Sequence, residues 1–416
     1  MIFSGVYRDG AKPARFLCSL IVAGIAYGLY RGVQDNYLVE VLKITPFERG
    51  IVEFFRELPG LLVVLILAAM WKLSESRIFK IGLSIMLAGI GGLLFSPSVK
   101  LFVVICMVIF SAGEHIIMPV KSTISLDLAQ SGKGGASLGI TSTINNLGNI
   151  AGYLIVTLIF FIFSRFGFKR ADAIEFRVVF AAAFMLMAAS VLISAAIKET
   201  SLKAARRRFY FARKFSKYYM LEVFYGARKQ IFLTFAPFVL ISVYGANTSV
   251  IASLLAICAL TGMLFSPVIG RLTDRLGYKF IMVADTLILI AVCFLYGFSH
   301  HIFPMEIAFI VVCVNFVLDS ILSLGSMATN VYVQSIASSP EEITATISTG
   351  ISVNHFISIF IALTGGYIWK VTGIEVLFSL SALLGAVNSV YAATIKKPRI
   401  EEPSPPPGEG GSVKRN

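Results

Sequence analysis

Charged side chains are scarce in this sequence. Of its 416 residues, 14% are Asp, Glu, Lys or Arg, whereas 57% are hydrophobic. Soluble domains are about 25% charged, and a soluble chain of this length would need that polar surface to cover its hydrophobic cores. The composition therefore excludes a water-soluble protein, and with it most enzymes. It predicts a protein whose solvent is the lipid bilayer.

Cysteines are few, and catalytic motifs are missing. All five cysteines lie inside apolar runs without paired spacing, so we interpret them as small buried hydrophobic residues and not as a disulfide or zinc framework. The sequence has no HExxH motif, no nucleophile elbow and no phosphate-binding loop that ends in Lys-Ser or Lys-Thr. It therefore predicts no cofactor, no metal site, no enzymatic activity and no ATP-driven pumping. The cysteines are Cys18, Cys106, Cys258, Cys293 and Cys313.

Long apolar runs dominate the chain. A membrane-spanning helix needs about 20 mostly apolar residues, and twelve stretches qualify. They lack the alternation of β-barrel strands. The predicted fold class is an all-α polytopic membrane protein with 12 transmembrane helices. The spans are expected near 15–41, 47–71, 78–97, 99–126, 135–164, 174–197, 218–245, 247–270, 278–299, 303–333, 342–370 and 373–395.

The basic residues predict the orientation of these spans. Of the 36 Lys and Arg residues, 23 fall on the side that would hold both termini, 8, Arg49 among them, fall in the opposite loops, and five lie within spans. By the positive-inside rule, we expect a multi-pass protein of the plasma (inner) membrane with both termini cytoplasmic. Most of the net charge of +13 thus reflects the orientation of the spans in the membrane. We therefore expect no nucleic acid as a partner.

A basic segment divides the chain in two. We expect a cytoplasmic linker at 198–217 between two six-helix bundles, at 15–197 and 218–395. Residues 1–14 would form a cytoplasmic N-terminus, and the Pro- and Gly-rich residues 396–416 a disordered cytoplasmic tail. The bilayer is the expected surrounding, and we expect a monomer.

Weak internal matches relate the two bundles. A shift of 198 residues places Tyr27-Gly28 on Tyr225-Gly226, and a shift of 209 places Asn145 on Asn354. Other short matches follow in the same order at nearly the same offset. This pattern predicts two parallel six-helix repeats.

One loop carries a recognisable signature. The stretch Gly270-Arg-Leu-Thr-Asp274-Arg275-Leu-Gly277-Tyr-Lys279, expected between the eighth and ninth spans, resembles the G-x-x-x-D-R-x-G-x-[RK] signature of the major facilitator superfamily. Its first-half counterpart at 71–80 is degenerate and keeps an acidic residue but neither glycine. The resemblance covers about residues 15–395 and implies a secondary transporter working by alternating access. It also implies gating roles for Gly270, Asp274, Arg275, Gly277 and Glu75.

Ionisable side chains inside spans are the candidates for function. Each costs about 2.5–3.5 kcal/mol at a helix centre, so it usually faces a cavity or a partner. In the first span Arg31 and Asp35 share one face. They form either an internal ion pair or a site where substrate or a proton competes for one partner. In the second span Glu53 faces Arg56 and Glu57, which predicts an extracellular gate or a structural network.

The other candidates for substrate binding or coupling lie in later spans. By the resemblance, the first, fourth, seventh and tenth spans line a central cavity, with the second, fifth, eighth and eleventh beside it. Carboxylates near the membrane middle commonly couple transport to protons, so Glu114 and Asp319 lead and Asp35 follows. The full set in these spans is Glu114, His115, Asn145, Arg228, Gln230, Asp319, Asn354 and His355.

The sequence thus predicts a secondary active transporter of a small polar solute, with protons as a second partner. Arg31 and Arg228, on opposite repeats, favour an anionic or zwitterionic solute, and the intramembrane carboxylates favour proton symport. The alternative is an exporter of amphipathic compounds or lipids. A non-transporting membrane receptor or scaffold is a remote alternative.

Overall fold

The structure is a computed structural model that describes residues 5–7, 11–95, 98–165, 174–197 and 210–395. Most of the predicted linker, 198–209, and the predicted tail, 396–416, lie outside the described residues. So does part of the predicted N-terminal segment.

The first six apolar stretches form six long helices, as predicted. α1 runs on without a break into a π-helical turn, η1 (Tyr37–Val41). The helices are α1 (Ala11–Asn36), α2 (Pro46–Ala69), α3 (Glu75–Phe95), α4 (Lys100–Leu128), α5 (Gly134–Arg165) and α6 (Ile174–Ala195).

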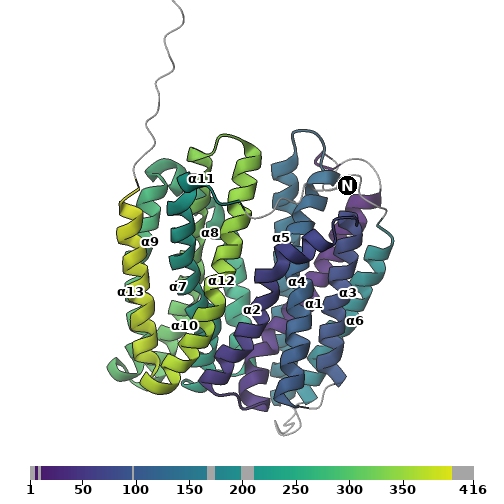
Figure 1. Cartoon of the computed structure of the whole chain (residues 1–416). Coiled ribbons are helices and arrows are strands. Elements are labelled where there is room, and N and C mark those ends of the chain that lie inside the picture. Colours follow the sequence, from purple (N-terminus) through teal and green to yellow (C-terminus); the bar gives the residue numbers. More distant parts are fainter. Residues whose placement is uncertain (1–4, 8–10, 96–97, 166–173, 198–209, 396–416) are drawn as a thin grey trace, which may run out of the picture.

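The second six stretches also form six spans. A short 3₁₀ helix, η3 (Arg213–Phe215), precedes them, and α10, a 3₁₀ turn η4 (Ser323–Ser326) and α11 follow one another as a single span. The twelve predicted spans are therefore confirmed (Figure 1). The helices are α7 (Ser216–Ser242), α8 (Thr248–Leu276), α9 (Tyr278–Ile302), α10 (Met305–Leu322), α11 (Met327–Ile336), α12 (Pro340–Thr372) and α13 (Ile374–Ala393).

Among the described helices, ten spans are long and apolar enough by composition to cross a membrane. The exceptions are α2 and α7, which carry Glu53, Arg56 and Glu57, and Arg228 and Lys229, within their sequences. The chain is an integral, multi-pass membrane protein. Below, α1–α6 are called the N-terminal half and α7–α13 the C-terminal half; the predicted domain boundaries stay a prediction.

The eighth span is longer than predicted. α8 continues to Leu276, so Gly270, Asp274 and Arg275 lie in its last turns and not in a loop. A helix satisfies its backbone hydrogen bonds internally, so it can extend beyond the apolar core into polar residues. The break comes at Gly277, whose φ of +84° lies in a region that glycine adopts without strain.

Each half has its own packed core. One cluster, built mainly from the N-terminal half, includes Tyr30, Phe79 and Phe110. A second in the C-terminal half includes Tyr296 and Phe378, whose rings stack with centroids 4.7 Å apart. The five cysteines are free. Cys106 and Cys293 are buried as expected, but Cys18 is exposed, so the prediction of burial is wrong there.

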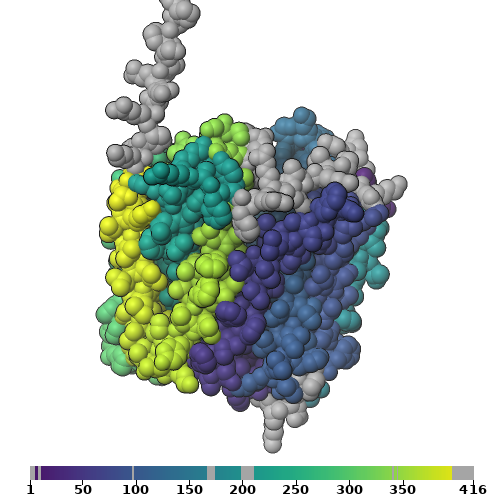
Figure 2. All heavy atoms as spheres, viewed as in Figure 1, coloured from purple at the N-terminus to yellow at the C-terminus, as the bar shows by residue number. Residues whose placement is uncertain are grey.

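The halves meet mainly through α2 with α12 and α5 with α8. α1 begins and α13 ends on one side of the molecule, here called the terminal side, and α2 and α12 touch on the opposite, far side (Figures 1 and 2). At that contact a Cβ on Gly50 would lie 2.4 Å from the Ala362 carbonyl oxygen. On the terminal side, a Cβ on Gly139 of α5 or Gly270 of α8 would meet nothing within 4 Å. The halves are therefore packed closely at this contact on the far side, whereas these two glycines face open space.

Candidate transport site

A buried chain of charges begins where α1 meets α2. Arg49, fully buried, donates to Asp35 Oδ1 at 3.0 Å and to Glu53 Oε2 at 2.8 Å. Arg31 instead donates to Gln34 Oε1 at 2.8 Å. The predicted alternative in which Arg31 and Asp35 form an ion pair with each other is therefore wrong, because Asp35 pairs with Arg49 and Arg31 bonds to Gln34. Asp35 pairs with Arg49 of the next helix, a contact that helical spacing within α1 cannot show.

The chain of charges continues along α2 through Arg56. Arg56 donates to Glu53 and Glu57, with Nη2 2.5 Å from a carboxylate oxygen of each, and its Nη1 lies 3.9 Å from Glu114 Oε2. Two contacts carry it into the C-terminal half. Gln230 Nε2 of α7 donates to Glu53 Oε1 at 3.2 Å, and His355 Nδ1 of α12 lies 2.9 Å from Glu57 Oε2. The predicted α2 cluster is therefore a network that links both halves.

A cavity of about 260 Å³ lies between the halves, beside this network. α1 supplies Arg31 and Asp35 to its wall, α7 supplies Arg228 and Lys229, and α10 supplies Asp319. Arg228 is 3% exposed, and its Nη1 lies 3.7 Å from Asp285 Oδ2 of α9. Its guanidinium also lies over the ring of Tyr225, 5.4 Å from the centroid.

The charges around this cavity are unequal. Its wall holds three cations, Arg31, Arg228 and Lys229, against two carboxylates, Asp35 and Asp319. Asp35 is already paired with Arg49, and Arg228 with Asp285, which leaves Arg31 and Lys229 against Asp319. The wall therefore presents an excess of positive charge.

A second, smaller cavity of about 170 Å³ lies within the N-terminal half. Tyr27, Glu114, Lys121 and Asn145 line it. The Tyr27 hydroxyl donates to Glu114 Oε1 at 2.9 Å. Two predicted site residues, Glu114 and Asn145, thus line the same cavity. Asp319 lines the other cavity, between the halves.

The remaining predicted residues are dispersed. Asn354 faces into the C-terminal half, where its Nδ2 donates to Glu222 Oε2 at 3.3 Å. Asp274 and Arg275 are exposed at the terminal-side end of α8, and Glu75 is buried in the first turn of α3. Their predicted gating role stays a prediction.

Sequence reasoning missed three charged residues that lie inside described helices. Arg49 is counted with the outer loops, although the expected span 47–71 already contains it, and it lies inside α2 (Pro46–Ala69). Asp285 in α9 and Glu222 in α7 are acids within predicted spans. The rule that intramembrane ionisable groups mark functional sites could have found both.

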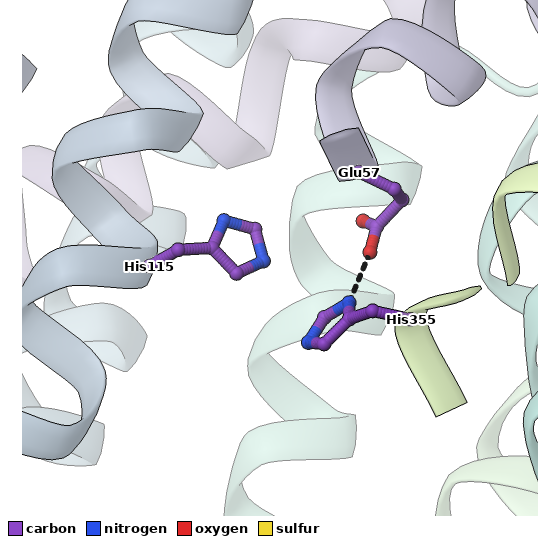
Figure 3. Close-up of side chains that lie close together, drawn as sticks. All are labelled: Glu57, His115 and His355. Carbon is purple, nitrogen blue, oxygen red and sulfur yellow. Dashed lines mark hydrogen bonds and ion pairs between the residues drawn. The ribbon is translucent and has the colours of Figure 1, made fainter. Parts of the chain in front are cut away.

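Within the part of the chain that the structure describes, two groups of side chains have the composition of metal ligands. Glu57, His115 and His355 converge from α2, α4 and α12 (Figure 3). His300 and His301 of α9 lie with Glu375 of α13. These groups contain all four histidines of the chain.

The sequence profile of the major facilitator superfamily matches residues 16–337 and 218–415. The chain belongs to the major facilitator superfamily. No curated protein sequence matches the chain. The motif at the α8 to α9 junction and the twelve helices of the chain agree with membership of the superfamily. This facilitator is therefore a secondary transporter of small molecules and not an enzyme.

Solved transporters share the fold of this facilitator. A variant of the nucleoside transporter NupG has a TM-score of 0.74 at 15% identity, covering 92% of this chain and 100% of that chain. A variant of the peptide transporter POT in complex with sulfate has a TM-score of 0.71 at 14% identity, covering 94% and 97%. The human organic anion transporter MFSD10 has a TM-score of 0.59 at 10% identity, covering 92% and 98%. At these identities the likeness concerns the fold alone.

Proposed function

We propose that this facilitator moves a small anionic or zwitterionic solute together with protons, by alternating access. The observation that carries the proposal is the excess of cations around the cavity between the halves, where Arg31, Arg228 and Lys229 face Asp319. Because these residues come from both halves, a solute bound among them would sense the relative movement of the halves.

Arg228 is the leading residue for binding an anion. Its Nε is buried and has no hydrogen-bond partner among the described residues. An unsatisfied buried donor carries a desolvation cost, and a carboxylate or phosphate oxygen of a solute would remove that cost. A planar guanidinium can also bind such a group through two parallel hydrogen bonds. Arg31 is the corresponding cation on the N-terminal half.

Asp319 is the leading residue for proton coupling. Its carboxylate lines the cavity, and no described residue forms an ion pair or a hydrogen bond with its side chain. The charge of Arg228 acts on it. Intramembrane carboxylates of this kind form proton relays in transporters. Protonation of Asp319 would increase the excess positive charge and so favour anion binding, which ties the proton to the solute.

Uptake into proteoliposomes tests both parts. We expect an imposed pH gradient to drive accumulation of a carboxylated or phosphorylated solute by the unsubstituted protein. Asp319→Asn should abolish dependence on the gradient while leaving solute exchange. Arg228→Lys should weaken solute binding at least tenfold. Transport that ignores the gradient would refute the coupling, and unchanged affinity in Arg228→Lys would remove Arg228 from the site.

We also propose that both termini are cytoplasmic, in a plasma (inner) membrane, and that the protein functions as a monomer. The basic residues on the terminal side support this orientation. The halves are then packed on the outer side, and the cavity releases its solute toward the cytoplasm. Labelling of a cysteine introduced at Leu101, on the far side, by an impermeant reagent in intact cells would check the orientation.

An exporter of amphipathic anions is the second candidate. Apolar side chains, Phe232, Leu233 and Phe316, form part of the same cavity wall, and they would suit a solute with an apolar tail. Comparing small carboxylates with carboxylates bearing an alkyl chain separates the two candidates. Preferential efflux of the amphipathic compounds would favour the exporter.

A further inference from the structure

Three side chains with metal-binding atoms meet where the two halves touch. Glu57 lies on α2 and His115 on α4, both in the N-terminal half, whereas His355 lies on α12 in the C-terminal half. Their nitrogen and oxygen ligand atoms all lie within 4.8 Å of one another. Figure 3 shows the His115 ring directed toward Glu57 and His355.

His115 has the orientation of a metal ligand. Its Nδ1 lies 2.8 Å from the carbonyl oxygen of Ser111, one turn earlier in α4. A proton on Nδ1 donates to that carbonyl and leaves the lone pair of Nε2 free. Histidines that bind metals commonly donate their other ring nitrogen to a backbone carbonyl in this way. Among the described residues, none forms a hydrogen bond with Nε2.

Gly60 provides the space between the rings. A Cβ at this position would lie 2.7 Å from His115 Nε2 and 2.9 Å from His355 Nδ1. The two nitrogens therefore face the same small volume, next to a Glu57 oxygen. A side chain at position 60 would occupy that volume.

The surrounding charge suits a dication. Arg49 and Arg56 contact the carboxylates of Asp35, Glu53, Glu57 and Glu114. With both imidazoles neutral, these two guanidinium groups contact four carboxylates, and Arg31 and Lys121 act on the outer two, Asp35 and Glu114. An ion would therefore find the Glu57 carboxylate as a ligand and further carboxylates beside it.

We propose that Glu57, His115 and His355 bind a divalent transition-metal ion such as Zn²⁺ and that the ion links the two halves. Two imidazole nitrogens and a carboxylate oxygen form a familiar zinc set that leaves a fourth position open. With bonds of about 2.0–2.1 Å, ligand atoms in a tetrahedral site lie about 3.3 Å apart. The ligand atoms now lie within 4.8 Å of one another, and small side-chain rotations would bring them to the tetrahedral separation.

Binding the ion requires one proton to leave His355 Nδ1, and no other covalent bond breaks. Without metal, His355 Nδ1 shares a hydrogen bond with Glu57. In the complex, the lone pair of Nδ1 binds the ion, so its proton moves to Nε2 of the same ring or, from an imidazolium, to solvent. Since the ligands come from both halves, the ion stabilises the form that is packed on the far side and slows alternation.

Zinc binding to the purified full chain tests this directly and does not depend on identifying a solute. The reference protein carries His300→Ala and His301→Ala, which removes the other histidine cluster. Zn²⁺ affinity is measured by competition with a chromophoric chelator. We expect the reference protein to bind one equivalent, and His115→Ala or His355→Gln to weaken binding at least tenfold. Size-exclusion profiles and melting temperatures show that the variants are folded.

Gly60→Ala provides a second variant in which all three ligands remain. We expect it to weaken Zn²⁺ binding at least tenfold, because its methyl group fills the ligand volume. Absence of Zn²⁺ binding by the reference protein would overturn the proposal. So would equal affinity in the reference protein, His115→Ala and His355→Gln. Neither result bears on solute transport, so failure here is distinct from failure of the proposed function.

Discussion

Gly50→Ala should shift the facilitator away from the form described here. A Cβ at Gly50 would lie 2.4 Å from the Ala362 carbonyl oxygen and 3.3 Å from Gly366 Cα, whereas ordinary van der Waals contact begins near 3.4 Å. Because both neighbours are backbone atoms, α2 and α12 would have to separate by about 1 Å. Overpacking of this kind costs about 1–3 kcal/mol.

The substitution raises the free energy only of the form in which α2 and α12 touch. A form in which these helices are apart is unaffected. The equilibrium constant between the two forms should therefore change by a factor of about 5 to 150. The assay is a distance distribution between spin labels at Leu101 and Val371, in a background lacking the five native cysteines. These positions are 71% and 60% exposed and lie on the far side of opposite halves.

Gly139→Ala is the matched control. Nothing lies within 4 Å of a Cβ at Gly139, so this variant should keep the distance distribution of the unsubstituted protein. Gly50→Ala should lose the short-distance population. Identical distributions for the two variants would refute the view that close α2 to α12 packing holds the far side together.

Two further predictions concern charged contacts. Arg49→Met should destabilise the protein by about 3–5 kcal/mol, because it leaves buried carboxylates uncompensated. The double variant Arg49→Met with Asp35→Asn should lose less stability than the sum of the two single variants. Additive losses in thermal unfolding would contradict the pairing of Arg49 with Asp35. In the first turn of α12, before the apolar span Ala345–Thr372, hydrogen bonds from Lys214 and Tyr210 lower the pKa of Glu342 to about 2. Since the folded pKa is lowered, this contact is complete above the ordinary glutamate pKa of about 4.3 and is lost as pH falls toward 2. Hydrogen exchange of residues 210–217, corrected for intrinsic rates, should therefore accelerate below about pH 4, and Glu342→Gln should show the fast rate already at neutral pH.

The spans were predictable because apolar length is a local property of the chain. Even α2 and α7, which fall short on composition, stand out between clear loop signals such as Thr45-Pro46, which caps α2. The end of α8 was not predictable in this way. Its last turns are polar, and a helix that leaves the apolar layer remains helical until a residue such as Gly277 ends it.

The partners of the intramembrane charges were only partly predictable. Glu53 and Arg56 share one helix face, and their contact follows from helical spacing. The partner of Asp35 is Arg49 from the next helix, and the partner of Glu57 is His355, from a helix almost three hundred residues later. Such choices depend on helix rotation and crossing, which a period of 3.6 residues does not specify.

The sequence by itself determined the twelve helices of this membrane protein and most of the ionisable residues that lie inside them, because hydropathy and charge act residue by residue. Only the tertiary structure decided how those residues divide among a cationic cavity, a buried network and a histidine cluster. Burial of a charge forces it to find a partner. Which partner it finds depends on the packing of helices that are distant in sequence.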